Sequence, residues 1–414
     1  MSPQLLLFDD IPWTTSEPQE RDLHAELRGF REFGTPTQVT SSGEVPVYTN
    51  EFWTAKQRAA SSLHEISYRA CFKPQLPRFF IQRLTAPGDT VYDPFMGRGT
   101  TVLEAALLGR RPLGCDVNPL SARLVEPRLA PPSLDELAAR LARIPLTGAE
   151  CPEDLLVFYH PETLEEICSL RQYLLEREAE SRLDGIDRWI RMVAVNRLTG
   201  HSAGFFSVYT MPPNQAVSVQ AQRKINQRRN QTPPRRVVRD ILLKKSRSLL
   251  ADCSDPTRSA LASVPARLHT GECFHVPEMV DDSVDLMVTS PPFLDVVDYK
   301  GDNWLRCWFC GIDPESVPIT MLKKLEDWRR AMTRAFREFY RVVRPGGHVA
   351  FEVGEVRHGV VKLEQSVVPC GREAGFHPRL ILINQQEFTK TANCWGVDNG
   401  AKGTNTNRIV LFQK

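Results

Sequence analysis

The chain alternates short apolar runs with amphipathic stretches, a pattern typical of an α/β protein. The predicted strands cover 90–92, 112–115, 266–270, 284–288, 348–353, 380–384 and 409–412. The clearest predicted helices cover 76–84, 102–108, 134–141, 164–175, 186–198 and 322–343. Because strands and helices follow one another in turn, we expect a Rossmann-like, doubly wound and mostly parallel sheet.

The strand-and-helix alternation stops in the middle of the chain and resumes later. We expect residues 46–130 and 265–414 to form one α/β domain. Residues 131–264 are expected to form a largely helical, basic insertion, because their apolar positions follow a helical period. Residues 1–45 have scattered Pro, Gly, Ser and Thr and are expected to form an irregular arm.

A glycine-rich loop follows the predicted strand at 90–92. It reads Asp93-Pro94-Phe95-Met96-Gly97-Arg98-Gly99-Thr100 and leads into a helix. Glycines in this position allow a tight turn and a close backbone approach to a ligand. The next strand ends at Asp116, with Asn118 close behind, where a carboxylate can accept two ribose hydroxyls. The spacing Phe-x-Gly-x-Gly differs from that of dinucleotide-binding loops, so a cofactor without a pyrophosphate is favoured.

A second loop, Thr289 to Phe293, follows the apolar strand at 284–288. Ser290 and Pro291 each precede a proline, so their carbonyl oxygens can point outward. Phe293 offers a flat apolar face on which a planar ring can stack. An ordinary Pro-Pro turn would also explain this tetrapeptide alone, and the glycine-rich loop and Asp116 favour the ligand-binding interpretation.

These two loops resemble motifs I and IV of the bacterial DNA methyltransferases that use S-adenosylmethionine to methylate exocyclic amino groups. Gly271-Glu272-Cys273 resembles motif III and Phe72-Lys73-Pro74 resembles motif X of that family. The resemblance covers the chain from about residue 52 onward, apart from the insertion, and motif I precedes motif IV as in the α class. The cofactor-binding residues that it implies are Phe72, Pro74, Asp93, Phe95, Gly97, Gly99, Thr100, Asp116, Asn118, Glu272 and Cys273.

The resemblance also implies a chemistry for the second loop, with Ser290, Pro291, Pro292 and Phe293 as catalytic residues. An aromatic amine becomes nucleophilic when acceptors such as the Ser290 hydroxyl and the Pro291 carbonyl hold its two N–H groups. The target base must be flipped out of the duplex, and Phe293 is its expected stacking partner. Serine at position 290 favours cytosine over adenine as the target. An RNA or protein methyltransferase and a non-catalytic nucleic-acid-binding module are the alternatives.

The insertion carries a strongly basic stretch, 218–247, with ten lysines and arginines against the single acid Asp240. Such a stretch beside the aromatic residues of 204–209 favours contact with double-stranded DNA, although a solvated basic helix is the alternative. The expected DNA-binding residues are Arg223, Lys224, Arg228, Arg229, Arg235 and Arg236. The insertion lies between motifs II and III, whereas α-class enzymes usually carry their target-recognition region between III and IV.

Composition adds little to these assignments. The net charge is +2, 25% of residues are charged, and no apolar run approaches the roughly 20 residues of a membrane span, so a cytoplasmic protein is expected. Cys307 and Cys310 have metal-like spacing but no second pair, so no metal is expected. Gln4-Leu5-Leu6-Leu7-Phe8 resembles a peptide that docks on the bacterial sliding clamp, although packing against the body is favoured. A cognate restriction endonuclease is a further partner that the resemblance suggests.

Overall fold

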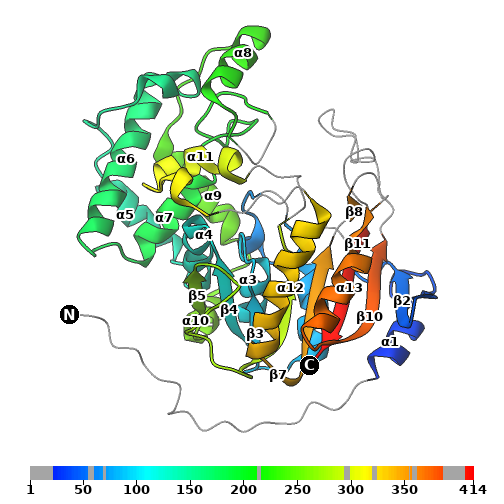
Figure 1. The fold of residues 1–414 in the computed structure, drawn as a ribbon. Coiled ribbons are helices and arrows are strands. Elements are labelled where there is room, and N and C mark those ends of the chain that lie inside the picture. The colour runs from blue at the N-terminus through cyan, green and yellow to red at the C-terminus, as the bar shows by residue number, and fades with distance from the viewer. Residues whose placement is uncertain are drawn as a thin grey trace.

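A computed structural model gives the fold of the chain (Figure 1). The structure describes residues 22–54, 60–68, 71–211, 216–292, 299–318, 324–353, 355–356, 361–385 and 406–414. The predicted clamp-binding peptide, 4–8, and the predicted stacking residue Phe293 lie outside the described residues.

Within the described residues the main sheet has nine strands in the order β1-β2-β10-β11-β7-β6-β3-β4-β5. The strands are β1 (Gln38–Ser42), β2 (Val45–Asn50), β3 (Thr90–Asp93), β4 (Arg111–Asp116), β5 (Arg267–Thr270), β6 (Val284–Thr289), β7 (Val343–Val353), β10 (His377–Gln385) and β11 (Thr406–Gln413). A separate short hairpin pairs β8 (Glu355–Val356) with β9 (Val361–Lys362).

The five strands from β5 to β7 pair in parallel, whereas β11 runs antiparallel to both of its neighbours. From β3 the chain moves outward to β4 and β5, then returns to place β6 on the other side of β3. The order therefore reverses between β3 and β6, and open α/β sheets bind ligands at the carboxyl ends of strands at such a switch point. The predicted Rossmann-like, mostly parallel fold is confirmed.

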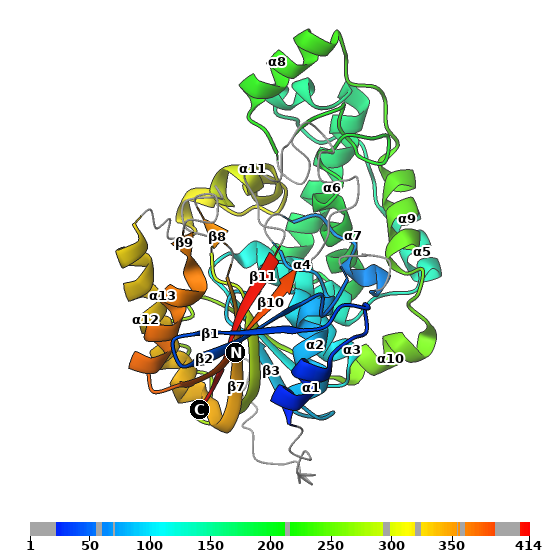
Figure 2. The same ribbon diagram turned by 90° about the vertical axis from the view of Figure 1, so that its right-hand side faces the viewer.

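Helices cover both faces of the sheet (Figure 2). The helices of this body are α1 (Leu23–Gly29), α2 (Gln75–Leu84), α3 (Thr100–Leu107), α4 (Pro119–Leu129), α10 (Asp255–Ser263), α12 (Leu325–Val342) and α13 (Leu363–Glu373). On one face α12 and α13 pack with Phe336 and Val367 against the strands, and on the other α2 packs with Phe80. Central strand residues such as Val288 and Val349 are completely buried.

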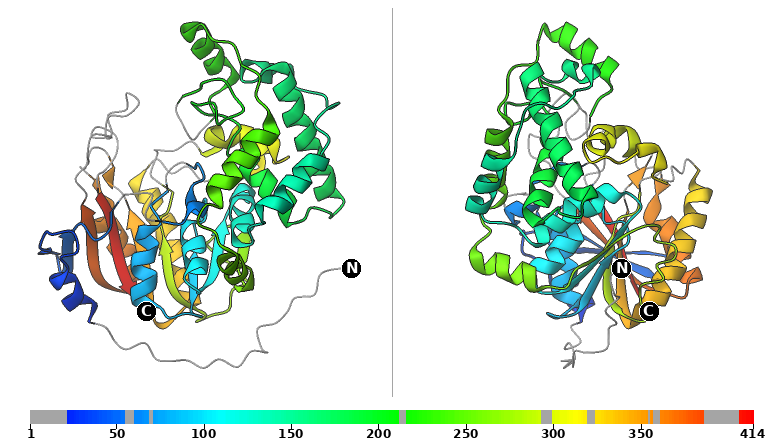
Figure 3. Two further views of the ribbon diagram at one scale, coloured as in Figure 1. Left: turned by 180° about the vertical axis from the view of Figure 1, so that it is seen from behind. Right: turned by 90° about the vertical axis from the view of Figure 1, so that its left-hand side faces the viewer.

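A helical lobe stands beyond the carboxyl ends of the parallel strands (Figures 1 and 3). It contains α5 (Leu134–Arg143), α6 (Pro161–Ala179), α7 (Gly185–Val195), α8 (Val219–Arg229), α9 (Val238–Leu249) and the short 3-10 helix η3 (Glu153–Val157). Helix α11 (Tyr299–Phe309) follows β6 in sequence but joins the lobe, since Leu305 and Phe309 share the lobe's core with Trp189. Cys307 and Cys310 are buried there as well.

The N-terminal region differs from the expectation of an irregular arm. Within 22–45 the chain forms α1 and β1, and β1 pairs with β2, which joins the main sheet beside β10. The prediction of an irregular arm was therefore wrong for this part. Most side chains of β1 are exposed and none is fully buried, so the strand lacks the apolar alternation that identifies a half-buried strand in sequence. No helix among the described residues is long and apolar enough to cross a bilayer.

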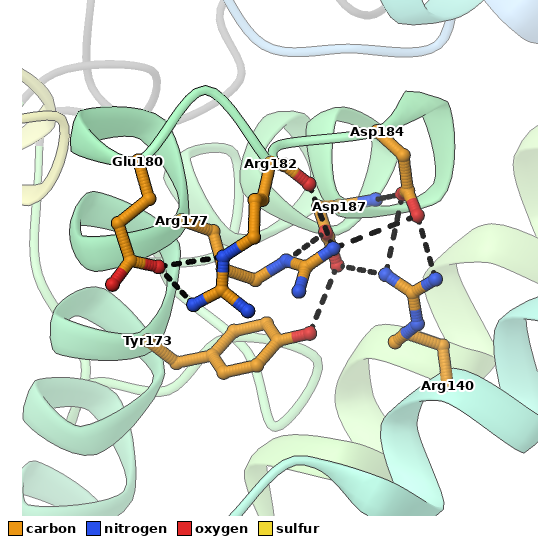
Figure 4. Close-up of polar contacts among 7 residues, drawn as sticks. All are labelled: Arg140, Tyr173, Arg177, Glu180, Arg182, Asp184 and Asp187. Atoms are coloured by element: carbon orange, nitrogen blue, oxygen red, sulfur yellow. Dashed lines mark hydrogen bonds and ion pairs between the residues drawn. The ribbon is translucent and has the colours of Figure 1, made fainter.

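A buried ion-pair network holds the lobe together (Figure 4). The carboxylate of Asp187, which has no exposed surface, accepts hydrogen bonds at 2.6 Å from Arg140 Nη1 and from Arg177 Nε. Tyr173 donates a further hydrogen bond at 3.3 Å, and Arg140 also contacts Asp184 at 2.6 Å. The network thereby links α5, α6 and α7 through one carboxylate.

We predict that Asp187→Ala lowers the free energy of unfolding by about 3–5 kcal/mol, because it leaves two arginines without their buried partner. Asp184→Asn is the matched control: that carboxylate is 42% exposed and asparagine can keep the N-cap of α7, so the change should cost no more than about 1 kcal/mol. Urea denaturation of the two variants measures both values. Equal losses would contradict the central role of Asp187.

Candidate active site

A cavity of about 370 Å³ opens at the switch point, beside the carboxyl ends of β3, β4, β5 and β6. The predicted site residues that line it are Phe72, Asp93, Phe95, Gly97, Thr100, Asp116, Asn118, Glu272, Cys273, Ser290, Pro291 and Pro292. The fold thus gathers five separate stretches of sequence around one space. Pro74 and Gly99 do not line the cavity: Pro74 lies at the start of α2.

The carboxylate of Asp116 fixes the glycine-rich loop. It accepts the backbone N–H of Gly97 at 2.8 Å and that of Asn118 at 2.8 Å, one on each oxygen. Burial raises the pKa of Asp116, while these hydrogen bonds act in the opposite direction. Since each carboxylate oxygen has a second lone pair, Asp116 can still accept hydrogen bonds from two neighbouring hydroxyls of a ligand.

Gly99 does not line the cavity but allows the glycine-rich loop to pack closely against α4. It has φ +73° and precedes α3, and a Cβ at this position would lie 2.3 Å from Cγ2 of Val125 in α4. Only glycine therefore lets the loop approach α4 this closely.

Asp93 joins the two loops of the site. The hydroxyl of Thr289 donates to Asp93 Oδ1 at 2.6 Å, and the N–H of Phe95 donates to the same oxygen at 3.1 Å. Burial raises the pKa of Asp93 to about 7. A carboxyl group in this state can become fully ionised when a positive charge enters the cavity.

Ser290 contacts a carboxylate that the sequence analysis missed. Its hydroxyl donates to Glu352 Oε2 at 2.6 Å, and Asn407 Nδ2 donates to the other oxygen of Glu352 at 3.2 Å. Glu352 is 5% exposed, and burial raises its pKa. A lone acid inside the apolar strand 349–353 was the available signal. On the same ledge, the indole of Trp328 donates to the carbonyl of Pro292 at 3.3 Å.

Tyr68 and Phe72 both line the cavity and form the part of its wall that we call the cover. The buried guanidinium of Arg98 donates to the carbonyl oxygens of Ile66 at 3.0 Å and Phe72 at 3.4 Å. Arg98 belongs to the glycine-rich loop, so loop and cover are held at a fixed separation. On the opposite wall, the guanidinium of Arg334 lies 4.6 Å from the ring centre of Phe274, and both residues line the cavity.

The basic residues predicted to bind DNA do not form one group. Arg223, Lys224, Arg228 and Arg229 are exposed on α8 at the far end of the lobe (Figure 1). The guanidinium of Arg229 lies 3.8 Å from the ring centre of Tyr209. Arg235, in contrast, forms ion pairs with Glu162 at 2.7 Å and Glu166 at 2.5 Å, and Arg236 is half-buried.

Comparison with known proteins agrees with this arrangement. The sequence model of a DNA methylase family, the N6/N4 methyltransferases, matches residues 14–126, which include the glycine-rich loop and Asp116. This match and the curated type II methyltransferase relatives support an exocyclic-amino DNA methyltransferase. The same findings support S-adenosylmethionine as the cofactor.

Several curated relatives are similar to this chain. It is 23% identical to the type II methyltransferase M.BsoBI of Geobacillus stearothermophilus over 66% of its own length and 58% of the relative's length. It is 31% identical to M1.MboII of Moraxella bovis over 25% of its own length and 40% of the relative's. The chain therefore spans little more than half of the first relative.

Among solved structures, a putative DNA modification methylase from Thermus thermophilus, complexed with S-adenosyl-L-methionine, shares 22% identity. That match covers 33% of this chain and 50% of the other, with a TM-score of 0.20. An S-adenosylmethionine-dependent methyltransferase from Methanosarcina mazei shares 13% identity over 81% of this chain and 96% of the other, with a TM-score of 0.32.

We predict that Gly99→Ala destabilises the protein by about 1–3 kcal/mol, because a positive φ and the contact with Val125 both oppose a side chain. Gly109→Ala is a close control: its φ is also +73°, but the nearest atom to an added Cβ is 4.0 Å away. The difference between the two variants in chemical denaturation measures the contact alone. Identical losses would contradict a packing role for Gly99.

Proposed function

We propose that this chain transfers the methyl group of S-adenosylmethionine to the exocyclic N4 amino group of cytosine in duplex DNA. The observation that carries the proposal is the hydrogen bond from the Ser290 hydroxyl to Glu352 beside the cavity. Because the hydroxyl proton is committed to Glu352, the lone pairs of Ser290 Oγ remain available to accept an N–H from an amine.

The cavity fits the proposed cofactor in three respects. Asp116 presents acceptor lone pairs suited to a ribose diol, and Asp93 is a carboxylate suited to a sulfonium charge. Phe72, Phe95 and Phe274 supply apolar wall for a purine ring. When bound, S-adenosylmethionine supplies an electrophilic methyl group on a positively charged sulfur.

The residues of the ledge then have defined tasks. Ser290 Oγ and the carbonyl oxygen of Pro291 would accept the two N–H groups of the target amine. Those hydrogen bonds draw the nitrogen toward tetrahedral geometry and restore its lone pair for attack. Glu352 acts through Ser290 as a positioning residue, since it fixes the direction of the hydroxyl proton.

The choice of cytosine rests on serine at position 290, since family members that methylate adenine usually carry Asp or Asn there. Adenine N6 is the second candidate and an RNA target a more distant one. The helical lobe, to which most of the insertion 131–264 belongs, is proposed to hold the DNA, with α8 contributing backbone contacts. A cognate endonuclease, and a location with the DNA in the cytoplasm, belong to the same proposal.

Mass spectrometry of nucleosides from host DNA, with and without expression of this chain, tests the function directly. We expect N4-methylcytosine to appear, and sequencing of the modified bases would give the recognition site. Ser290→Ala should lower the methylation rate about 100-fold or more, by analogy with the loss of one transition-state hydrogen bond. N6-methyladenine instead would replace the cytosine assignment, and no DNA methylation in any sequence context would refute the function.

We predict that Glu352→Gln lowers the methylation rate and removes the contribution of Glu352 to the acidic limb of the pH profile, while the contribution of Asp93 stays. In the wild type, protonation of Glu352 lets this carboxyl donate to Ser290 Oγ and fill the lone pair that the amine needs. Since burial raises the pKa of Glu352 above its ordinary 4.5, activity should fall as the pH drops through that raised value.

Methylation rates measured over a range of pH test both effects. The affinity for S-adenosylhomocysteine shows that the variant is folded. A glutamine variant that keeps the same acidic limb would show that another group titrates. Full activity at every pH would remove Glu352 from the mechanism.

A further inference from the structure

Three cationic side chains gather where the helical lobe meets the cavity. Arg197 follows the end of α7, Arg306 belongs to α11 and Lys245 to α9. Arg306 is 8% exposed, and the side chain of Lys245 is 13% exposed. Arg197 lowers the pKa of Lys245, and Arg306 lowers that of Arg197, so the three charges act on one another.

The cluster reaches the rim of the cavity through one backbone unit. The N–H of Ser67 donates to Asn196 Oδ1 at 2.8 Å, and the carbonyl of Ser67 accepts from Arg306 Nη2 at 3.0 Å. The next residue, Tyr68, lines the cavity. Arg197 therefore lies one residue from a direct contact with the cavity's cover.

Arg197 has an unusual environment for a charged group. Its guanidinium carbon lies 4.1 Å from the ring centre of Phe205, and its Nε donates to the carbonyl of Asn196 at 2.6 Å. No carboxylate in the described part of the chain forms an ion pair with it, whereas Lys245 has Glu65 at 3.9 Å. Burial and Arg306 lower the pKa of Arg197 to about 10.

A half-buried cation that stays charged at neutral pH is stabilised when an anion completes its environment. A guanidinium that lies over an aromatic ring can still donate N–H groups from its edge, and that edge matches the oxygens of a phosphate. A flipped nucleotide also needs its backbone held beside the pocket that receives its base.

We propose that Arg197 binds a backbone phosphate next to the target nucleotide, on the DNA strand whose base enters the cavity. The inference rests on the proposed function, because it requires DNA as the substrate. It assigns a phosphate contact near the cavity, separate from any contacts that the exposed basic residues of α8 make. The other anion near this rim would be the carboxylate of the cofactor, and the experiment separates the two sources.

The test compares Arg197→Ala and Arg197→Lys with Arg188→Ala. Arg188 is a matched control, because it lies on α7 and has a carboxylate neighbour, Glu126, at 3.5 Å. Fluorescence anisotropy with a labelled duplex that carries the recognition site, over a series of salt concentrations, gives the slope of log affinity against log salt. Calorimetry with S-adenosylhomocysteine reports cofactor binding in the same samples.

We expect Arg197→Ala to make the salt slope shallower by about one, as for the loss of one phosphate contact, with unchanged S-adenosylhomocysteine affinity. Arg197→Lys should keep the slope, because it keeps the charge, and Arg188→Ala should match the wild type. Should Arg197→Ala fail to fold, Arg197→Gln carries the same test with a polar side chain of similar length.

An unchanged slope in the folded neutral variant would overturn the inference. So would weaker S-adenosylhomocysteine binding with unchanged DNA binding, which would assign Arg197 to the cofactor. If the wild-type chain itself neither binds nor methylates DNA, the proposed function fails rather than the placement of Arg197.

Discussion

The buried hydrogen bond between Thr289 and Asp93 fixes the relation between the two loops of the site. Both residues end neighbouring parallel strands at the point where the strand order reverses. The loops that follow must diverge, one toward α3 and the other toward α11, and the space between them becomes the cavity. Because the hydrogen bond ties the strand ends together, the glycine-rich loop and the loop that begins at Ser290 keep a constant separation at their starts.

The same geometry explains why the lobe and the cavity are coupled. After the ledge the chain does not return at once to the sheet but enters α11, whose apolar side chains belong to the lobe's core. Arg306 of α11 and Asn196 at the end of α7 then hold the backbone of Ser67, beside the cavity's cover. Any movement of the lobe would therefore be transmitted to Tyr68, the next residue, which lines the cavity.

The parallel sheet and its two loops could be predicted because strand, glycine turn and Pro-Pro turn each have a local sequence signature. As expected, the two loops meet at one cavity. Glu352 and Asn407 carry no such signature: they reach Ser290 only because β7 lies beside β6 and β11 lies beside β7. The basic residues of 218–247 separate into exposed and paired ones for a related reason. A count of charges takes no account of tertiary partners. Arg235 forms ion pairs with two carboxylates, and Arg239 donates hydrogen bonds to backbone carbonyls at the end of α5.

The partnership of Ser290 with Glu352 bears on the target base. An Asp or Asn at position 290 would bring acceptor oxygens of its own and would need no help to present one to an amine. A serine brings a hydroxyl whose proton can point at the amine and block it. Glu352 removes that ambiguity because it accepts a hydrogen bond from the Ser290 hydroxyl. The hydrogen bond from Asn407 holds the Glu352 carboxylate in position. The buried acid on β7 is thus the structural counterpart of serine on β6, and together the two residues present an acceptor oxygen beside the cavity.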